Sequence, residues 1–342
     1  MLAAVLYGKE QLRVEPVAVP SLAEGDALVR VKAALTCGTD VKVFRRGYHA
    51  RMIIPPAVFG HELAGDVVAV GEKVTRFRPG QRVVAANSAP CQQCYYCRRG
   101  VENLCEDLLF NNGAYAEYIR IPARIVARNT YEIPATISYQ DAALVEPLAC
   151  VLRGLEETGM RPGDQVAVVG LGPIGLMFVR LAKTRGARVI ALGRRVTQLE
   201  RAQAMGADEL LCTQRLADPA RTVRELTGGH GADVAIEAVG KPETWEIAVQ
   251  MVRRGGTVNF FGGCASDSRV SLETALIHYS EITCKASFHH TPAHIRRALD
   301  LIAAGIISAR DFVNREEPLG NLLEVMRHLM SHNGHLKTAI IP

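Results

Sequence analysis

The glycine-rich segment at 170–175, Gly-Leu-Gly-Pro-Ile-Gly, constrains the fold of this 342-residue chain more than any other stretch. It follows a short apolar run at 165–170 and precedes a helical pattern at 173–185. In such a turn the first glycine allows the tight bend, the second lets a pyrophosphate approach the backbone, and the third lets helix and strand pack closely. The segment therefore predicts a dinucleotide-binding turn, with these contact residues: Gly170, Gly172, Pro173, Ile174 and Gly175.

The surrounding pattern supports this interpretation. Short continuous apolar runs at 188–192, 209–212, 233–237 and 257–261 alternate with helical segments at 197–205 and 242–252. Apolar strands separated by helices are typical of a parallel sheet that is covered on both faces. We therefore expect a doubly wound α/β domain at 147–284.

The remainder of the chain has a different texture. Short β-branched or alternating runs at 27–33, 66–70, 82–86 and 116–121 are separated by Gly and Pro turns, which indicates a mostly β domain. The apolar stretch at 336–342 reads as a last strand that rejoins this domain. We expect a domain at 1–146, the doubly wound domain after it, and a return to the first domain at 285–342.

Bulk composition excludes several classes of function. The chain is 48% hydrophobic and 22% charged, as in ordinary globular proteins, and its length favours two domains. The net charge of +5 comes without a long basic run, so neither a nucleic-acid partner nor a membrane partner is expected. The first residues lack the features of a secretory signal, and no apolar segment is long enough to span a bilayer. A cytoplasmic location is expected.

Four of the nine cysteines are clustered, and these are Cys91, Cys94, Cys97 and Cys105. Short gaps of this kind let a chain wrap four thiolates around one tetrahedral ion, so they predict a structural zinc in a lobe at about 88–108. An iron–sulfur cluster also uses thiolates at short spacing, although no Pro follows the last Cys as in a bacterial ferredoxin run. A disulfide pair is the third alternative, and a reducing compartment disfavours it.

A second candidate metal site combines Cys37 with His61 and Glu62. A thiolate, an imidazole and a carboxylate are donors that bind zinc while leaving a position open, which is typical of a catalytic ion. Taken alone, Cys37 is equally explained as a small buried apolar residue, and His61 with Glu62 as a satisfied polar pair.

The end of the second strand of the doubly wound domain indicates which cofactor is used. An acidic residue normally binds the adenosine ribose there, but this chain has Gly193, followed by Arg194 and Arg195. Guanidinium groups bind a 2′-phosphate, whereas a carboxylate would repel it. We therefore expect NADP to be favoured. The alternative is that the two arginines form a solvated helix start and that the protein takes NAD.

Taken together, these motifs resemble the zinc-dependent medium-chain dehydrogenases, in particular the branch of sorbitol, other polyol and threonine dehydrogenases. The resemblance covers essentially the whole chain and rests on these segments in order: Cys37-Gly-Thr39-Asp40, Gly60-His61-Glu62, the four clustered cysteines, Glu146-Pro147 and the glycine-rich turn. It implies a GroES-like catalytic domain built from both chain ends and a Rossmann domain between them.

The resemblance also implies roles for individual residues. Cys37 and His61 would bind a catalytic zinc, and Glu62 and Glu146 would share its remaining coordination directly or through water. Without the family, Glu146 would be an ordinary charge at a helix start. Thr39 would hydrogen-bond the substrate oxygen, and Asp40 would orient the imidazole of His61. Many relatives carry a His three residues after the Thr, whereas this chain has Lys42, which leaves the proton route open.

The implied activity is hydride transfer between a secondary alcohol or polyol, or the matching ketone, and NADP or NAD, in a homodimer or homotetramer. A threonine-type substrate is an alternative. So are a zinc-binding protein without turnover and a zinc-free quinone reductase, which would lack both cysteine sets. Several residues are candidates to line the substrate pocket, although packing or surface exposure is the more usual explanation for each of them: His49, Phe59, Phe110, His289 and His290.

Overall fold

The computed structural model describes residues 1–49, 51–331 and 336–342, which form two compact units. The first unit comprises Met1–Ala149 and His290–Pro342, and the second comprises Cys150–His289. Within the described ranges, no helix is both long enough and apolar enough to cross a lipid bilayer.

The first unit is mostly β. Its strands are β1 (Leu2–Gly8), β2 (Gln11–Pro16), β3 (Ala27–Leu35), β4 (Ala57–Val58), β5 (Glu62–Val70), β6 (Arg82–Ala85), β7 (Ser88–Ala89), β8 (Leu109–Phe110), β9 (Tyr118–Ile121), β10 (Thr130–Glu132), β17 (Val313–Pro318) and β18 (Lys337–Ile341). Its helices are α1 (Gly38–Arg46), α2 (Tyr95–Arg98), α3 (Ala123–Asn129), α4 (Tyr139–Ala143), α11 (Pro292–Ala303), α12 (Ala309–Phe312) and α13 (Leu322–Ser331), with 3-10 turns at Glu102–Leu104 and Leu319–Asn321. Helix α5 (Val145–Glu156) contains the boundary between the units.

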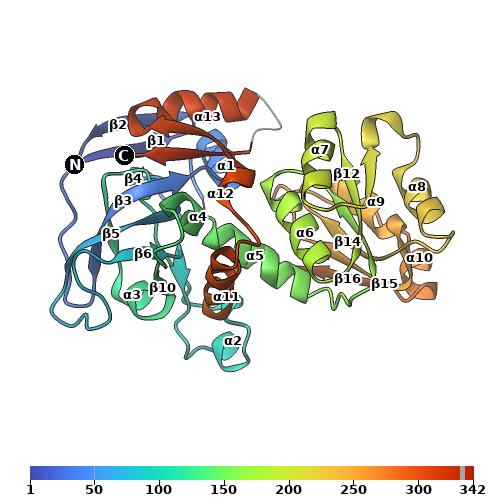
Figure 1. The fold of residues 1–342 in the computed structure, drawn as a ribbon, viewed down its shortest axis with the longest axis horizontal. Helices are drawn as coiled ribbons and strands as arrows, with labels where there is room; N and C mark the ends of the chain where they lie inside the picture. Colours follow the sequence, from blue (N-terminus) through green and yellow to red (C-terminus); the bar gives the residue numbers. More distant parts are fainter. Residues whose placement is uncertain (50, 332–335) are drawn as a thin grey trace. The chain divides into compact units, whose positions relative to one another are not determined.

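A seven-stranded sheet in the order β10-β6-β5-β3-β18-β17, with β9 also paired to β3, organises this unit. Strand β3 alternates buried Val29 and Val31 with exposed Arg30, as expected for a strand that has one face in the core. Strand β18 comes from the end of the chain, which Figure 1 marks with C, and it pairs with β3. In this pairing Ala339 lies opposite Leu35. This confirms that both chain ends build the β unit.

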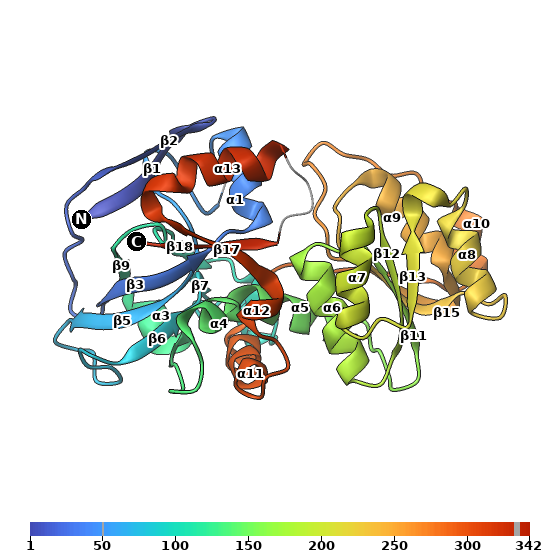
Figure 2. The same cartoon turned by 45° about the horizontal axis from the view of Figure 1, so that its top comes forward.

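The register of β3 and β5 decides where the candidate site forms. The two strands are antiparallel, and Leu35 lies opposite Glu62. The segment that leaves β3 at Thr36 and the segment that enters β5 at His61 therefore meet at the same end of the sheet. Helix α1 continues from the first of these segments, and α13 packs beside it (Figure 2).

The second unit has the predicted doubly wound sheet. Its parallel strands run in the order β13-β12-β11-β14-β15-β16, which is the Rossmann order. The strands are β11 (Gln165–Val169), β12 (Arg188–Gly193), β13 (Glu209–Cys212), β14 (Ala232–Glu237), β15 (Val252–Phe260) and β16 (Thr283–Ala286). The helices are α6 (Pro173–Thr184), α7 (Val196–Ala204), α8 (Pro219–Leu226), α9 (Pro242–Met251) and α10 (Thr274–Tyr279), with a 3-10 turn at Thr213–Arg215.

Helices α6 and α7 cover one face of this sheet, and α8 and α9 cover the other (Figure 1). Helix α8 was not among the helices expected from sequence. It has only eight residues and few of them are apolar, although the two buried ones, Ala220 and Val223, lie three positions apart on one face of the helix. Its start is fixed locally, because the Asp218 side chain accepts a hydrogen bond from the amide of Arg221 at 2.9 Å.

Candidate active site

Cys37 caps the N-terminus of α1. Its backbone is extended (φ −122°, ψ 151°), and its Sγ accepts a hydrogen bond from the amide of Thr39 at 3.5 Å. The Asp40 carboxylate closes the cap from the other side, because its Oδ2 accepts a hydrogen bond from the amide of Cys37 at 3.0 Å. The Cys-Gly-Thr-Asp motif therefore works as a helix cap that also fixes the thiol.

His61 enters the site from the start of β5. It follows Gly60, whose φ of +91° lies in the left-handed region, and a Cβ on Gly60 would come within 2.6 Å of the Tyr115 ring. The His61 Nδ1 lies 2.9 Å from Asp40 Oδ1, and both side chains are buried. Because Nδ1 is engaged, Nε2 is the nitrogen that can bind a metal.

Asp40 controls the charge of this imidazole. Burial alone would lower the pKa of His61, but the neighbouring Asp40 carboxylate and Cys37 outweigh it and raise that pKa well above its usual range. A carboxylate in this position makes the imidazole a better donor toward a cation. Asp40 thus faces the imidazole that it is predicted to orient.

Glu62 lies beside Cys37 and His61, and one donor atom from each of the three lies within 4.8 Å of the others. Its two carboxylate oxygens accept hydrogen bonds from Lys337 Nζ at 2.7 and 2.6 Å, and the same ammonium donates to Thr36 O at 3.1 Å. Burial raises the pKa of Glu62 to about 7 even beside this lysine. Glu62 thus belongs to the cluster while also forming a buried ion pair with Lys337.

Glu146 occupies the first turn of α5 and is largely buried. Its Oε1 lies 3.8 Å from His290 Nε2, and His290 Nε2 lies 3.0 Å from Asn87 Oδ1. Burial raises the pKa of Glu146, although the charges of His61 and Lys337 oppose that shift. Glu146 is therefore close enough to feel the charge of the cluster, and it also contacts Asn87 and lies near His290.

The other predicted residues around this cluster occupy different settings. Thr39 is half-buried in the first turn of α1, whereas Lys42 is exposed on the same helix. The His49 Nδ1 accepts hydrogen bonds from the amides of Arg51 and Met52. Phe59 is buried against Tyr115, so it is a core residue, and Phe110 lies in the small β7-β8 sheet.

The four clustered cysteines converge as predicted. Their sulfur atoms lie within 4.8 Å of one another, with Cys91 Sγ 3.9 Å from Cys97 Sγ and Cys94 Sγ 3.8 Å from Cys105 Sγ. Amides of the lobe point at the sulfurs, as in the bond from Cys94 N to Cys91 Sγ at 3.3 Å. Hydrogen bonds from the amides of Cys97 and Glu106 lower the pKa of Cys94 to about 6. The four sulfur atoms are therefore close enough together to surround one ion.

The glycine-rich turn links β11 to α6. Gly170 has a φ of +97°, and a Cβ on Gly175 would lie 1.8 Å from Gly170 O, so that position accepts only glycine. Nothing lies within 4 Å of a Cβ placed on Gly172, which is the N-cap of α6, and Pro173 opens the helix. The turn thus leaves its backbone open at Gly172, next to the helix N-terminus.

The residues expected to choose between the two cofactors follow β12. Gly193 ends this strand, Arg194 is exposed, and Arg195 is the N-cap of α7. A Cβ on Gly193 would come within 2.8 Å of the Leu171 side chain, so packing favours glycine there.

Two residues that bond to the residues of the site were not predicted from the sequence. Lys337 is a charged residue in an otherwise apolar C-terminal strand, and that anomaly is a usable signal for a buried ion pair. Tyr115 is fully buried and donates a hydrogen bond to Asp40 Oδ2 at 2.6 Å. No spacing rule connects Tyr115 with Asp40, because the two residues meet only through the sheet.

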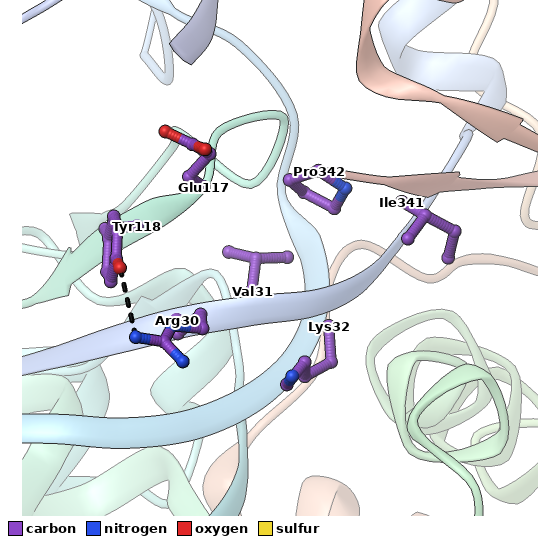
Figure 3. Close-up of a pocket in the computed structure, with 7 residues that line it drawn as sticks. All are labelled: Arg30, Val31, Lys32, Glu117, Tyr118, Ile341 and Pro342. Atoms are coloured by element: carbon purple, nitrogen blue, oxygen red, sulfur yellow. Dashed lines mark hydrogen bonds between the residues drawn. The ribbon is translucent and has the colours of Figure 1, made fainter. Parts of the chain in front are cut away.

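A separate hollow of about 200 Å³ opens on the first unit, lined by Arg30, Val31, Lys32, Glu117, Tyr118, Ile341 and Pro342 (Figure 3). Its polar groups already bond within the protein: Arg30 donates to the Tyr118 hydroxyl at 3.2 Å, and Glu117 accepts from the amide of Leu2 at 2.7 Å. None of the predicted site residues lines this hollow.

Comparisons with known proteins agree with this geometry. Residues 23–134 match the alcohol dehydrogenase GroES-like domain family, and residues 173–304 match the zinc-binding dehydrogenase family. The chain is 31% identical over 350 residues to sorbitol dehydrogenase of Bacillus subtilis, covering 100% of this chain and 97% of that protein. This chain belongs to the zinc-dependent medium-chain dehydrogenases, in the polyol dehydrogenase branch.

Solved structures of this family share the whole fold. Alcohol dehydrogenase TADH from Thermus sp. ATN1 superposes with a TM-score of 0.90 at 32% identity, covering 100% of this chain and 99% of that chain. A Sinorhizobium meliloti 1021 protein, described as a zinc-binding dehydrogenase and bound to NADP, gives 0.91 at 31% identity with the same coverage. Membership in the family therefore supports zinc and NAD(P) as cofactors and confirms the predicted combination of GroES-like and Rossmann domains.

Proposed function

We propose that this dehydrogenase interconverts a secondary alcohol of a polyol and the corresponding ketone, with NADP favoured over NAD as the hydride carrier. The observation that carries the proposal is the cluster of Cys37, His61 and Glu62, whose donor atoms lie within 4.8 Å of one another and whose imidazole is oriented by Asp40. The alternative substrate class is a threonine-type amino alcohol.

The donor atoms fit zinc in two different ways. The lobe offers four thiolates and nothing else, which is the closed set of a structural ion. The cluster offers a thiolate, an imidazole and a carboxylate, which is the open set of a catalytic ion. We therefore assign one structural and one catalytic zinc to each chain. Cys37 and His61 would hold the catalytic ion, with Glu62 or Glu146 supplying an oxygen.

When bound, zinc supplies a Lewis acid that lowers the pKa of an alcohol, and the nicotinamide supplies the hydride acceptor. The residues of the chain would position the substrate proton and the metal ligands. The Thr39 hydroxyl would hold the proton of the substrate oxygen, and Asp40 keeps the His61 ring oriented. Lys42 is exposed on the same helix, so it would meet solvent at the outer end of the proton route.

The second unit would hold the cofactor. Its pyrophosphate would meet the open backbone at Gly172 and the N-terminus of α6. Gly193 ends β12 at the position where an acidic residue is expected, and Arg194 and Arg195 follow it, which favours a 2′-phosphate at this position. The NADP bound to the Sinorhizobium meliloti relative supports this preference.

Metal analysis combined with a substrate panel tests the proposal. The purified protein should contain two zinc ions per chain. Cys37→Ser should contain one, keep its fold and lose turnover. Polyols, secondary alcohols and threonine, each with NADP and with NAD, are then compared through the absorbance of the reduced cofactor. A protein with a single zinc that Cys37→Ser does not remove would overturn the catalytic assignment, and a preference for threonine would overturn the substrate class.

A further inference from the structure

Tyr115 contacts the His61–Asp40 pair from a distant part of the first unit. Its side chain is fully buried, and its hydroxyl lies 2.6 Å from Asp40 Oδ2 and 3.1 Å from Leu35 O. A hydroxyl has a single proton to donate. The charged Asp40 carboxylate is both nearer and a stronger acceptor than the Leu35 carbonyl. The hydroxyl therefore donates to Asp40.

Asp40 is held at three points. Its Oδ1 faces His61 Nδ1 at 2.9 Å, and its Oδ2 accepts from the amide of Cys37 at 3.0 Å and from Tyr115. The carboxylate is almost completely buried, so each lost hydrogen bond leaves a charged oxygen that water does not reach. Removing the Tyr115 hydroxyl leaves Oδ2 with the Cys37 amide alone and frees the carboxylate to turn.

Tyr115 also fixes the segment that carries the imidazole. Its amide donates to Phe59 O at 2.9 Å, and the amides of Gly113 and Ala114 donate to Gly60 O. The Tyr115 ring fills the space that any side chain on Gly60 would occupy and packs edge-on against Phe59, with ring centroids 5.7 Å apart. One residue therefore sets the position of the strand entering His61 and, through its hydroxyl, the carboxylate that His61 faces.

We propose that Tyr115 is a positioning residue of the catalytic metal centre, whose hydroxyl locks Asp40 and thereby sets how tightly Cys37 and His61 hold their ion. This rests on the proposed function, because it presumes an ion at those two residues. Burial and the Asp40 carboxylate raise the pKa of Tyr115 well above its usual value, so the hydroxyl keeps its proton as a donor at neutral pH. Tyr115 acts through Asp40 and touches neither the ion nor the substrate.

The test uses Tyr115→Phe, which removes only the hydroxyl and keeps the ring against Phe59 and Gly60. Zinc affinity at both sites is measured on the full chain by competition with a chelator, and cobalt(II) absorption reports the geometry of the Cys37–His61 site. We expect about tenfold weaker zinc at this site, since partners behind a metal ligand typically change affinity by about 10- to 100-fold. The cobalt spectrum should also change, while the four-cysteine site stays at wild-type affinity as an internal check of folding.

Tyr118→Phe is the matched control. It removes a hydroxyl three residues away that bonds only the exposed Arg30 in the contacts described above, and it should leave both affinities unchanged. A double-mutant cycle supplies the second readout, because Tyr115→Phe should weaken zinc binding no further when Asp40→Ala, which removes the acceptor, is already present. A purely structural role for Tyr115 would add its effect in both backgrounds.

The outcomes separate the two proposals. A wild-type chain without zinc at Cys37 and His61 would overturn the proposed function. A wild-type chain with two zinc ions, in which Tyr115→Phe keeps wild-type affinity and cobalt spectrum, would overturn the role of Tyr115 alone. An equal loss of affinity with and without Asp40 would also overturn it.

Discussion

The ammonium of Lys337 lies 2.7 and 2.6 Å from the two carboxylate oxygens of Glu62, joining residues 275 positions apart in a fully buried ion pair. The pair links the last strand, β18, to the first residue of β5. The Lys337 ammonium also donates a hydrogen bond to Thr36 O, next to Cys37. The C-terminal strand is therefore part of the wall of the candidate active site.

Lys337→Met should destabilise the first unit strongly. Glu62 would then be buried without its partner, and removing one member of such a pair typically costs about 3–5 kcal/mol of unfolding free energy. Urea denaturation followed by circular dichroism measures the loss. The double variant Glu62→Gln with Lys337→Met removes both charges of the pair and should recover most of the lost stability. A double variant no more stable than Lys337→Met would show that packing of the lysine, and not its charge, is what matters.

The two glycines of the cofactor turn should respond differently to alanine. Gly175→Ala places a Cβ 1.8 Å from Gly170 O and should destabilise the second unit by about 3 kcal/mol or more. Gly172→Ala meets no atom within 4 Å and has a φ of −74°, so the fold should remain intact while the approach of the pyrophosphate is blocked. Thermal denaturation and cofactor titration by fluorescence separate the two effects. Normal NADP binding by Gly172→Ala would contradict the assigned role.

Replacing Arg194 and Arg195 by alanine should reverse the cofactor preference. Hydrogen bonds to a charged group contribute about 1.5–3 kcal/mol, so we expect the catalytic efficiency with NADP to fall about 10- to 100-fold while that with NAD changes little. Steady-state kinetics with both cofactors measures this. Arg201→Ala, in the last turn of α7, is a control for loss of positive charge alone. Equal losses with NADP and NAD would argue against a 2′-phosphate contact.

Cys97→Ser should remove the structural ion and leave the catalytic one. The lobe has few buried apolar residues of its own, and its order is expected to depend on the metal. The measurements are zinc content, which should fall from two ions to one, and amide hydrogen exchange, which should rise within residues 91–105. Cys284→Ser, at an exposed cysteine outside the lobe, is the control. Unchanged exchange in the lobe would mean that the chain holds this loop without an ion.

Asp141 should contribute an acid-labile part of the stability. Burial works to raise the pKa of Asp141, but hydrogen bonds from Ser138, Ala309 and Ser308 outweigh it and hold the pKa below the usual 3.8. The stabilisation is therefore complete above about 3.8 and is lost as the pH falls through the lower folded value. Asp141→Asn should be less stable than wild type near neutral pH, and the difference should shrink at low pH. Denaturation curves across the pH range measure this, and a constant difference would contradict it.

Local sequence patterns determined most of the fold. The glycine-rich turn predicted a strand followed by a helix, because only glycine fits at Gly170 and Gly175. Alternating apolar strands and helices predicted the parallel sheet, and the cysteine spacing predicted that four sulfurs would converge. Helix α8 was missed because its eight residues include few apolar ones, although its buried positions have helical spacing.

The tertiary structure alone decided how the candidate active site is supported. Sequence motifs named Cys37, His61 and Asp40, but spacing along the chain does not predict that Tyr115 and Lys337 reach them. The Lys337 contact, between residues 275 positions apart, depends on the pairing of β3 with β5 and β18. The Tyr115 contact, between residues 75 positions apart, depends on the backbone hydrogen bonds that hold Tyr115 against Ala4 and Phe59. The residue types of the metal-binding side chains can be read from the local sequence. The residues that hydrogen-bond those side chains are set by strand register, which is fixed only when the whole sheet packs.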